Sequence, residues 1–336
     1  MSPERPPATP GRVAAATAKA AFLALLALVF ALFFGATSVD PWSILTGTAD
    51  DVARAKVFEF RLPRAVMAAI VGAALAVAGL VFQALIRNPL ASPYVLGVSS
   101  GGSFGAVLAL AAGAYWVGPA AFLGAAAAVL LVYAVARRGG RFPASSLLLA
   151  GVMVNAFFGA AIMFVNLAAA PRDQERILRW IVGGLRDFYE PSTLAEAGSA
   201  VVLVVVALFF VGRELNLLAL SDAGAERAGV ALKPMRRGLF LAASLLTAAA
   251  VSTAGPIGFV GLVVPHFARL CCGPDHRVLV PVCAFGGAAF LGVVDAAAQG
   301  IWRTPLPAGV LTALLGGPLF LFLLRRGDRA RAGLEF

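Results

Sequence analysis

The segment RNPLASPYVLGVSSGG, residues 87–102, joins two long apolar runs of the chain. Pro89 and Pro93 lack a backbone N–H donor and disfavour helical geometry in the residues that precede them. We therefore expect one apolar helix to end near Arg87 and the next to begin near Tyr94. The structural joint predicted here comprises Asn88, Pro89, Pro93, Gly97 and Gly101.

Small residues follow this joint at helical spacing. Gly97, Gly101 and Gly105 recur every four residues, which places them on one face of a helix. Such a ridge lets the backbone of another membrane helix approach closely. Taken alone, the ridge indicates ordinary membrane packing.

The composition places the whole chain in a lipid bilayer. Hydrophobic residues make up 60% of the 336 positions and charged residues only 13%, more apolar surface than a soluble domain could bury in one core. A helix needs about 20 apolar residues to cross roughly 30 Å of hydrocarbon. About ten runs qualify: 20–39, 63–84, 95–113, 117–136, 144–168, 193–213, 238–256, 258–272, 279–299 and 308–325. TAGPIGFVG, residues 253–261, barely separates two of them and predicts a tight or re-entrant joint that protein must cover.

Charge sets the predicted orientation. The first apolar run follows basic residues, as a secretory signal does, but it is long and lacks a small-residue cleavage site, so we interpret it as a retained helix. Lys and Arg outnumber Asp and Glu on the side that holds both termini, which predicts a cytoplasmic location for that side. The expected organisation is an N-terminal cytoplasmic tail (1–19), one membrane domain (20–326) and a C-terminal cytoplasmic tail (327–336). The basic charge then reflects orientation, and no nucleic-acid partner is expected.

Several chemistries lack the residues they need. None of the three lysines (Lys19, Lys56 and Lys233) follows a glycine, so the chain has no phosphate-binding loop for ATP. The two histidines and three cysteines offer no metal-ligand spacing, and no metal site or enzymatic activity is expected. Asp295 is the one good candidate for an ionisable group used in ion-coupled transport.

Four ordered motifs are more specific than any single feature. They are residues 61–102, from RLPR through the joint, then LNLLALSDAGAERAGV (215–230), AGPIGFVGLVVPHFARLCCGPDHR (254–277) and LPAGVLTALLGGPLFLFLLRR (306–326). Together they resemble the permeases of the type II ABC importers for iron-siderophore complexes, haem and cobalamin. The resemblance implies an all-α polytopic fold with ten transmembrane helices and alternating access as the mechanism.

The same resemblance implies a set of partners. The permease would pair with a second copy of itself in the inner membrane and bind two cytoplasmic ATPase subunits. ATP and Mg would bind to those subunits, and no cofactor to this chain. A periplasmic or lipid-anchored binding protein would deliver the substrate.

Particular residues take roles from this resemblance. In the cytoplasmic loop 214–237, Ser221 or Asp222 can cap a short helix, and the family match makes this helix the ATPase contact. The expected contact residues are Asp222, Glu226, Arg227 and Gly229.

Arg61 and Arg64 would dock the binding protein at the outer surface. A further docking arginine of the family is Gln299 here, and Arg303 is a candidate replacement one helical turn on. The substrate path is expected along 144–168, with Asn155, Phe158, Met163 and Asn166 as candidates that can equally join helices. Beyond it, Arg172, Arg176 and Arg179 could attract an anion but are offset by nearby acids.

The predicted function is import of a metal chelate, with a ferric siderophore preferred and haem or cobalamin as alternatives. An ion-coupled secondary transporter is the rival class, and it would need several buried acids. A structural or receptor membrane protein would lack an ATPase-docking loop.

Overall fold

The computed structural model describes residues 9–35, 37, 39–136, 144–302 and 304–332, with side chains described as far as residue 320 except at 144. Regular structure in these ranges is entirely helical, which confirms the predicted fold class. Ten apolar helices correspond to the ten predicted runs. They are α1 (Pro10–Phe33), α4 (Leu62–Ile86), α5 (Val98–Ala111), α6 (Val117–Ala136), α7 (Ala144–Ala168), α9 (Pro191–Phe210), α12 (Leu232–Ala254), α13 (Val260–Cys272), α14 (His276–Gly300) and α15 (Ala308–Ala332).

Among the described residues, seven helical stretches are long and apolar enough to cross a membrane, and α5, α13 and residues 308–320 of α15 are shorter apolar helices. The remaining elements are α2 (Pro41–Leu45), α3 (Asp51–Ala55), the π-helical turn η1 (Lys56–Arg61), α8 (Pro171–Val182), α10 (Gly212–Leu220) and α11 (Asp222–Arg227).

The first helix differs in its bounds from the prediction. It begins at Pro10, inside the expected tail, and ends at Phe33 rather than at residue 39. Thr9 caps it by accepting a hydrogen bond from the Arg12 amide, and Pro10 occupies the first helical position, where its missing N–H is not needed. At the other terminus, α15 continues to Ala332 and so enters the second predicted tail.

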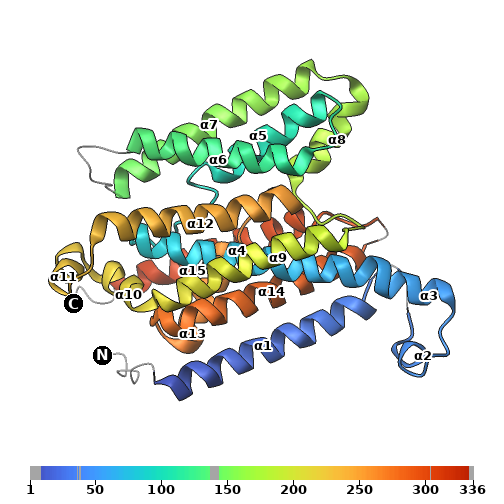
Figure 1. Cartoon of the computed structure of the whole chain (residues 1–336), viewed down its shortest axis with the longest axis horizontal. Helices are drawn as coiled ribbons and strands as arrows, with labels where there is room; N and C mark the ends of the chain where they lie inside the picture. The colour runs from blue at the N-terminus through green and yellow to red at the C-terminus, as the bar shows by residue number, and fades with distance from the viewer. Residues whose placement is uncertain (1–8, 36, 38, 137–143, 303, 333–336) are drawn as a thin grey trace.

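Helix α4 is the centre of the main core. Nearly every residue from Arg64 to Ile86 is buried, as expected for a helix that is apolar on all sides. It packs against α12, α13 and α14, and α1 lies along α14 at the periphery (Figure 1).

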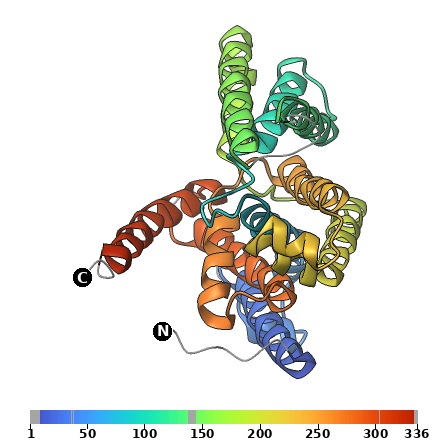
Figure 2. The ribbon, with the colours of Figure 1, turned by 90° about the vertical axis from the view of Figure 1, so that its left-hand side faces the viewer.

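Helices α5 to α8 form a second group beside α12 (Figure 1). Their own core includes Val107, Leu110 and Ala121 from α5 and α6 and Ile177 from α8. Viewed along the helices, α7 (green) and α15 (red) reach away from the remaining helices (Figure 2). Large apolar side chains on both are exposed, among them Phe164 and Leu314.

The joint between α4 and α5 contains the predicted break, but α5 begins at Val98 rather than near Tyr94. Turns occupy residues 89–90 and 93–97, and Gly97 precedes the helix with a φ of 75°, which suits glycine. Of the predicted ridge, Gly101 and Gly105 face α6, whereas Gly97 lies before the helix and faces Val154 of α7. A Cβ atom added at Gly101 would lie 2.6 Å from the Gly124 carbonyl oxygen of α6, and one at Gly105 would lie 2.1 Å from that of Ala120.

A second tight joint, residues 255–259, connects α12 to α13 as predicted. Gly255 has a φ of 67° and Phe259 a φ of 66°. Protein covers the joint: the Gly184 amide donates to the carbonyl oxygen of Ala254 over 2.8 Å. The Phe259 ring lies against Gly316 of α15, where an added Cβ atom would come within 2.3 Å of the ring.

Candidate functional site

The two ends of the bundle hold different candidate sites. Helices α10 and α11 and the start of α1 lie at one end, here called the α11 end, and α2 and α3 lie at the other, the α2 end (Figure 1). Candidate ATPase contacts lie at the α11 end, and the docking arginines Arg61 and Arg64 precede or begin α4 towards the α2 end.

Helix α11 is the short capped helix expected in the loop. The Ser221 hydroxyl accepts a hydrogen bond from the Gly224 amide over 2.9 Å, so Ser221 rather than Asp222 is the cap. Ala225 is fully buried beneath the helix, whereas Glu226, Arg227 and Gly229 are exposed. This outward surface is available to a partner.

Asp222 connects α11 to two other elements. Its Oδ1 atom accepts a hydrogen bond from Arg236 of α12 over 2.6 Å and also bonds the guanidinium of Arg87. Arg87 donates from Nε to the carbonyl oxygen of Leu218 in α10 over 2.9 Å. Asp222, whose side chain is 45% exposed, therefore ties α11 to the joint after α4 and to α12.

Arg87 has an unusual backbone as well. It ends α4 in the left-handed region with a φ of 53°, which is uncommon for a residue other than glycine. The next residue, Asn88, accepts a hydrogen bond from the Leu90 amide on its side-chain oxygen over 2.9 Å. This side chain stabilises the turn in the manner typical of Asn before Pro.

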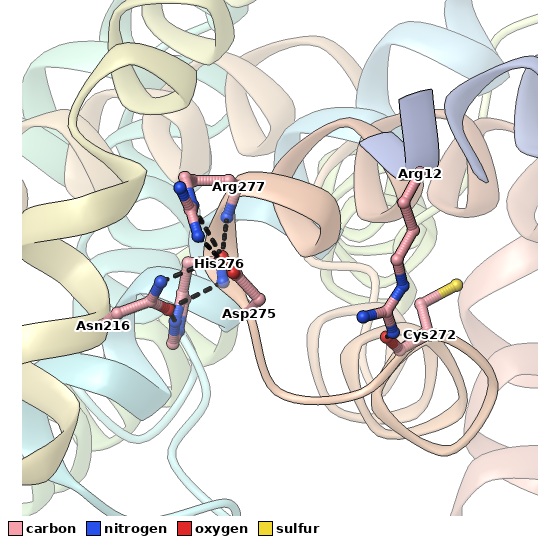
Figure 3. Close-up of polar contacts among 6 residues, drawn as sticks. All are labelled: Arg12, Asn216, Cys272, Asp275, His276 and Arg277. Atoms are coloured by element: carbon pink, nitrogen blue, oxygen red, sulfur yellow. Dashed lines mark hydrogen bonds and ion pairs between the residues drawn. The ribbon is translucent and has the colours of Figure 1, made fainter. Parts of the chain in front are cut away.

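A second network joins α10 to α14 (Figure 3). The Asn216 side-chain oxygen accepts from the His276 amide over 2.8 Å and lies 2.7 Å from His276 Nδ1. Its Nδ2 donates to Asp275 over 2.9 Å. Partial burial acts to raise the pKa of Asp275, but hydrogen bonds from Arg277 and Asn216 outweigh it and hold the pKa at about 2.

At the α2 end, Arg64 is buried instead of reaching the surface. Its Nε and Nη2 atoms bind the two carboxylate oxygens of Asp295, and its Nη1 binds Asp187 over 2.7 Å. Nearby, burial raises the pKa of Tyr189 to about 12, and its hydroxyl donates to the carbonyl oxygen of Thr253. Docking by Arg64 stays a prediction, but in this conformation its guanidinium is already satisfied internally.

The other docking candidates differ in their surroundings. Arg61 is partly exposed, and it donates to the carbonyl oxygens of Leu32 and Thr37, which fixes the end of α1 beside η1. Gln299 is half-buried near the end of α14. Arg303 lies outside the described residues, so its proposed replacement role stays a prediction.

The path candidates on α7 do not share one environment. Asn155 and Met163 are exposed, and Asn166 is half-buried with a side-chain oxygen that has no hydrogen-bond partner among the described residues. Phe158 is buried, with its ring centre 5.3 Å from that of Phe104 in α5. Of the four, Phe158 therefore packs between helices, while the others stay candidates for the path.

The segment after α7, expected as a loop, is helix α8. Proline at its first position favours this helix. Asp173 lies 3.7 Å from both Arg172 and Arg176, and Glu175 lies 2.7 Å from Arg179. As expected, the positive charges of these arginines are partly balanced by the neighbouring acids Asp173 and Glu175.

Sequence reasoning missed the partners that organise both ends. Arg87, Arg236 and Asp187 were not singled out as site residues, although each binds a residue that was, and Asn216 with its partners Asp275 and His276 was also missed. These pairs could not be predicted from sequence spacing, because 135 positions separate Arg87 from Asp222 and 123 separate Arg64 from Asp187. The one available hint was a long basic residue directly before an Asn-Pro turn at the end of a span.

Comparison with known proteins identifies the chain's family. The model of the FecCD transport family matches residues 23–326. The chain belongs to this family. Its curated relatives include the cobalamin import system permease protein BtuC of Halobacterium salinarum, 42% identical over 301 residues that cover 85% of this chain and 79% of the relative. The hemin transport system permease protein HmuU of Yersinia pestis is 36% identical over 326 residues, 93% of this chain and 96% of that protein.

A solved structure agrees with the fold of this FecCD family member. An inward-facing structure assigned to the metal-chelate type of ABC transporter superposes with a TM-score of 0.82 at 28% identity and covers 93% of this chain and 99% of that one. The chain is therefore a multi-pass permease subunit of an ABC transporter, in which ATP hydrolysis belongs to a separate subunit.

Proposed function

We propose that this permease imports a large metal chelate by alternating access, driven by ATPase subunits that dock on α11. The observation that carries the proposal is the link from Asp222 to Arg87 and Arg236. Through it, a displacement of α11 reaches the end of α4, the most buried helix, and the start of α12. Packed helices joined by ion pairs can transmit such a displacement as a change between two arrangements.

The substrate class rests on the relatives and on the character of α7. Sequence motifs favoured a ferric siderophore, whereas the curated relatives above are named for cobalamin and hemin. The exposed face of α7 is apolar, with Val152, Phe157 and Phe164 beside Asn155 and Met163. Such a surface offers a bulky chelate contact area with few strong hydrogen bonds, which permits release. Cobalamin is the first candidate, followed by haem and a ferric siderophore.

The assembly and orientation are part of the proposal. Two copies of the chain would pair through the exposed apolar faces that include α7, and two ATPase subunits would bind the exposed surface of Glu226, Arg227 and Gly229. A periplasmic or lipid-anchored binding protein would dock at the α2 end. The α11 end and both termini would then face the cytoplasm, with the chain in the inner membrane.

The ion-coupled alternative has little support in the geometry. Asp295, its candidate coupling group, is buried with both oxygens bound by Arg64. Both carboxylate oxygens are thus occupied by one guanidinium, and Asp295 serves as the structural partner of Arg64.

Reconstitution tests the proposal directly. The permease, its ATPase and its binding protein are placed in proteoliposomes, and uptake of cobalamin, haem and a ferric siderophore is followed with ATP inside or outside. We expect ATP-dependent uptake of one of the three that is lost with Glu226→Arg. Uptake that follows a proton or sodium gradient without ATP would overturn the importer assignment.

A further inference from the structure

A cavity of 480 Å³ opens at the α11 end between the start of α1, the end of α4, α10 and the turn from α13 to α14. Three arginines from three different helices line it: Arg12, Arg87 and Arg269. The acid in its lining is Asp275, which is already held by Arg277 and Asn216. The cavity is therefore positively charged.

Arg269 is the least compensated of these cations. It is partly buried, and its guanidinium donates to the side-chain oxygen of Gln83. The Gln83 side-chain amide is fixed in this orientation because its Nε2 donates to the carbonyl oxygen of Gly261 over 3.0 Å. Within the described ranges Arg269 has no carboxylate partner. A buried cation is normally paired, so Arg269 can accept an anionic partner from outside the described chain.

The other two arginines are held in place by the protein. Arg12 descends from α1 and donates to the carbonyl oxygen of Cys272 at the end of α13 over 2.6 Å (Figure 3). Arg87 is fixed by Leu218 and Asp222. Guanidinium groups held in fixed positions suit the tetrahedral oxygens of a phosphate, which accept two hydrogen bonds from one planar fork.

We propose that this cavity is a binding site for a phosphate group, supplied by the headgroup of an anionic lipid or by a soluble phosphate compound. A lipid source fits the location. Helix α1, whose first turn brings Arg12 to the cavity, is peripheral and exposes Phe22, Leu23 and Leu26, along which the acyl chains of such a lipid could lie. On the proposed orientation it faces the cytoplasmic leaflet, where basic pockets between helices bind anionic headgroups.

The site also touches the elements that the proposed mechanism moves. Its lining includes Asn88 and Pro89 of the joint after α4 and Asn216 of α10. A bound phosphate would therefore hold the α4 joint, α10 and the α13–α14 turn in one arrangement. Phosphate binding itself does not depend on the identity of the imported substrate or on transport.

The test uses the purified full-length permease in nanodiscs of phosphatidylcholine, with and without phosphatidylglycerol. Retained lipid is counted by native mass spectrometry, and inorganic phosphate is titrated into the phosphatidylcholine discs as a separate arm. Arg269→Gln is expected to weaken phosphatidylglycerol binding about tenfold, the typical value of one charge-assisted contact. Arg213→Gln, at an exposed arginine of α10 outside this cavity, is the matched control and is expected to change nothing.

Arg12→Gln provides a second variant if Arg269→Gln fails to fold, and size-exclusion profiles establish folding for each. Arginine-dependent binding of phosphatidylglycerol alone assigns the site to lipid, and arginine-dependent binding of inorganic phosphate that displaces the lipid assigns it to soluble phosphate compounds. Equal binding by both variants and the control would overturn the proposal. So would unchanged binding together with weaker capture of the ATPase, because the arginines would then belong to the subunit interface.

Discussion

Arg64 and Asp295 face each other through two hydrogen bonds, 2.7 Å from Nε to Oδ2 and 2.9 Å from Nη2 to Oδ1, although 231 positions separate them. The pair joins the start of α4 to the last turns of α14, and both side chains are buried. A two-point contact of this kind fixes orientation as well as distance. A buried ion pair therefore links α4 to α14 at the α2 end of the main core.

Removing one partner of this pair leaves an uncompensated buried charge. We expect Asp295→Ala to lower the free energy of unfolding by about 3–5 kcal/mol, measured by thermal or denaturant unfolding in detergent. Asp187→Ala is the matched control, because the Asp187 side chain is 89% exposed and its pair with Arg64 should contribute no more than about 1 kcal/mol. Equal losses in the two variants would contradict the buried pair.

The Arg87–Asp222 link is tested by a double-mutant cycle. Asp222→Ala and Arg87→Ala should each reduce ATP-driven uptake, by about tenfold if the link carries a typical coupling energy. The double variant should be little worse than either single one, because both remove the same contact. Ser221→Ala, which removes the cap but leaves Asp222, should have the smaller effect on uptake. Strictly additive losses would show that the two residues act separately.

The close approach of α5 and α6 predicts a steric penalty. Gly105→Ala would place a Cβ atom 2.1 Å from the Ala120 carbonyl oxygen, so the helices must separate, at a cost of about 1–3 kcal/mol. Gly159→Ala in α7, where an added Cβ atom meets nothing within 4 Å, is the control. The unfolding temperature of both variants in one detergent checks the difference, and an unchanged Gly105→Ala protein would refute the close contact.

The exposed face of α7 can be mapped by thiol labelling. In a background without Cys271, Cys272 and Cys283, a cysteine at Met163 should react with a bulky maleimide, since that side chain is 59% exposed. A cysteine at Phe158, which is 7% exposed, should not. If Met163 lines the path, saturating substrate slows its labelling in the assembled transporter. Protection by the second subunit alone, without any substrate effect, would place Met163 in the dimer interface instead.

Asp275 gives a prediction for pH. Its pKa of about 2 lies below the ordinary value of 3.8, so its carboxylate stabilises the fold above about pH 4 and this contribution is lost as the pH falls towards 2. The stability difference between the protein and Asp275→Asn should therefore shrink over that interval. Thermal unfolding at a series of pH values measures it, and a constant difference would mean that the charge of Asp275 contributes nothing.

Most of the helical architecture could be predicted because each membrane helix corresponds to a long apolar run in the sequence. Apolar length located all ten helices, and prolines and glycines located the joints after α4 and α12. The bounds of α1 were wrong because a local cap, Thr9 with Pro10, starts a helix before the apolar run begins. The extent of the joint was also underestimated, since turn geometry continues as far as Gly97.

Site residues could be predicted only where the residues of one site follow one another in the sequence. The α11 helix and its capping were evident in LSDAGAER, whereas the internal partner of Arg64 was not, because a charged residue near a helix end also fits a headgroup contact. Arg87 and Asp222 lie in two different motifs, and nothing in either motif says that the two touch. Pairing across the bundle depends on how α4, α10 and α12 pack, which periodicity does not encode.

The Phe259 ring limits how closely α15 can pack against the joint before α13. The ring occupies the space that a side chain at position 316 would need, so glycine there permits the shortest separation between α15 and the joint before α13. A series of Gly, Ala and Val at this position would push α15 outward in steps. Because the main contacts of α15 are with α13 and α14, that series would act as a graded spacer between α15 and this joint without altering any charged group.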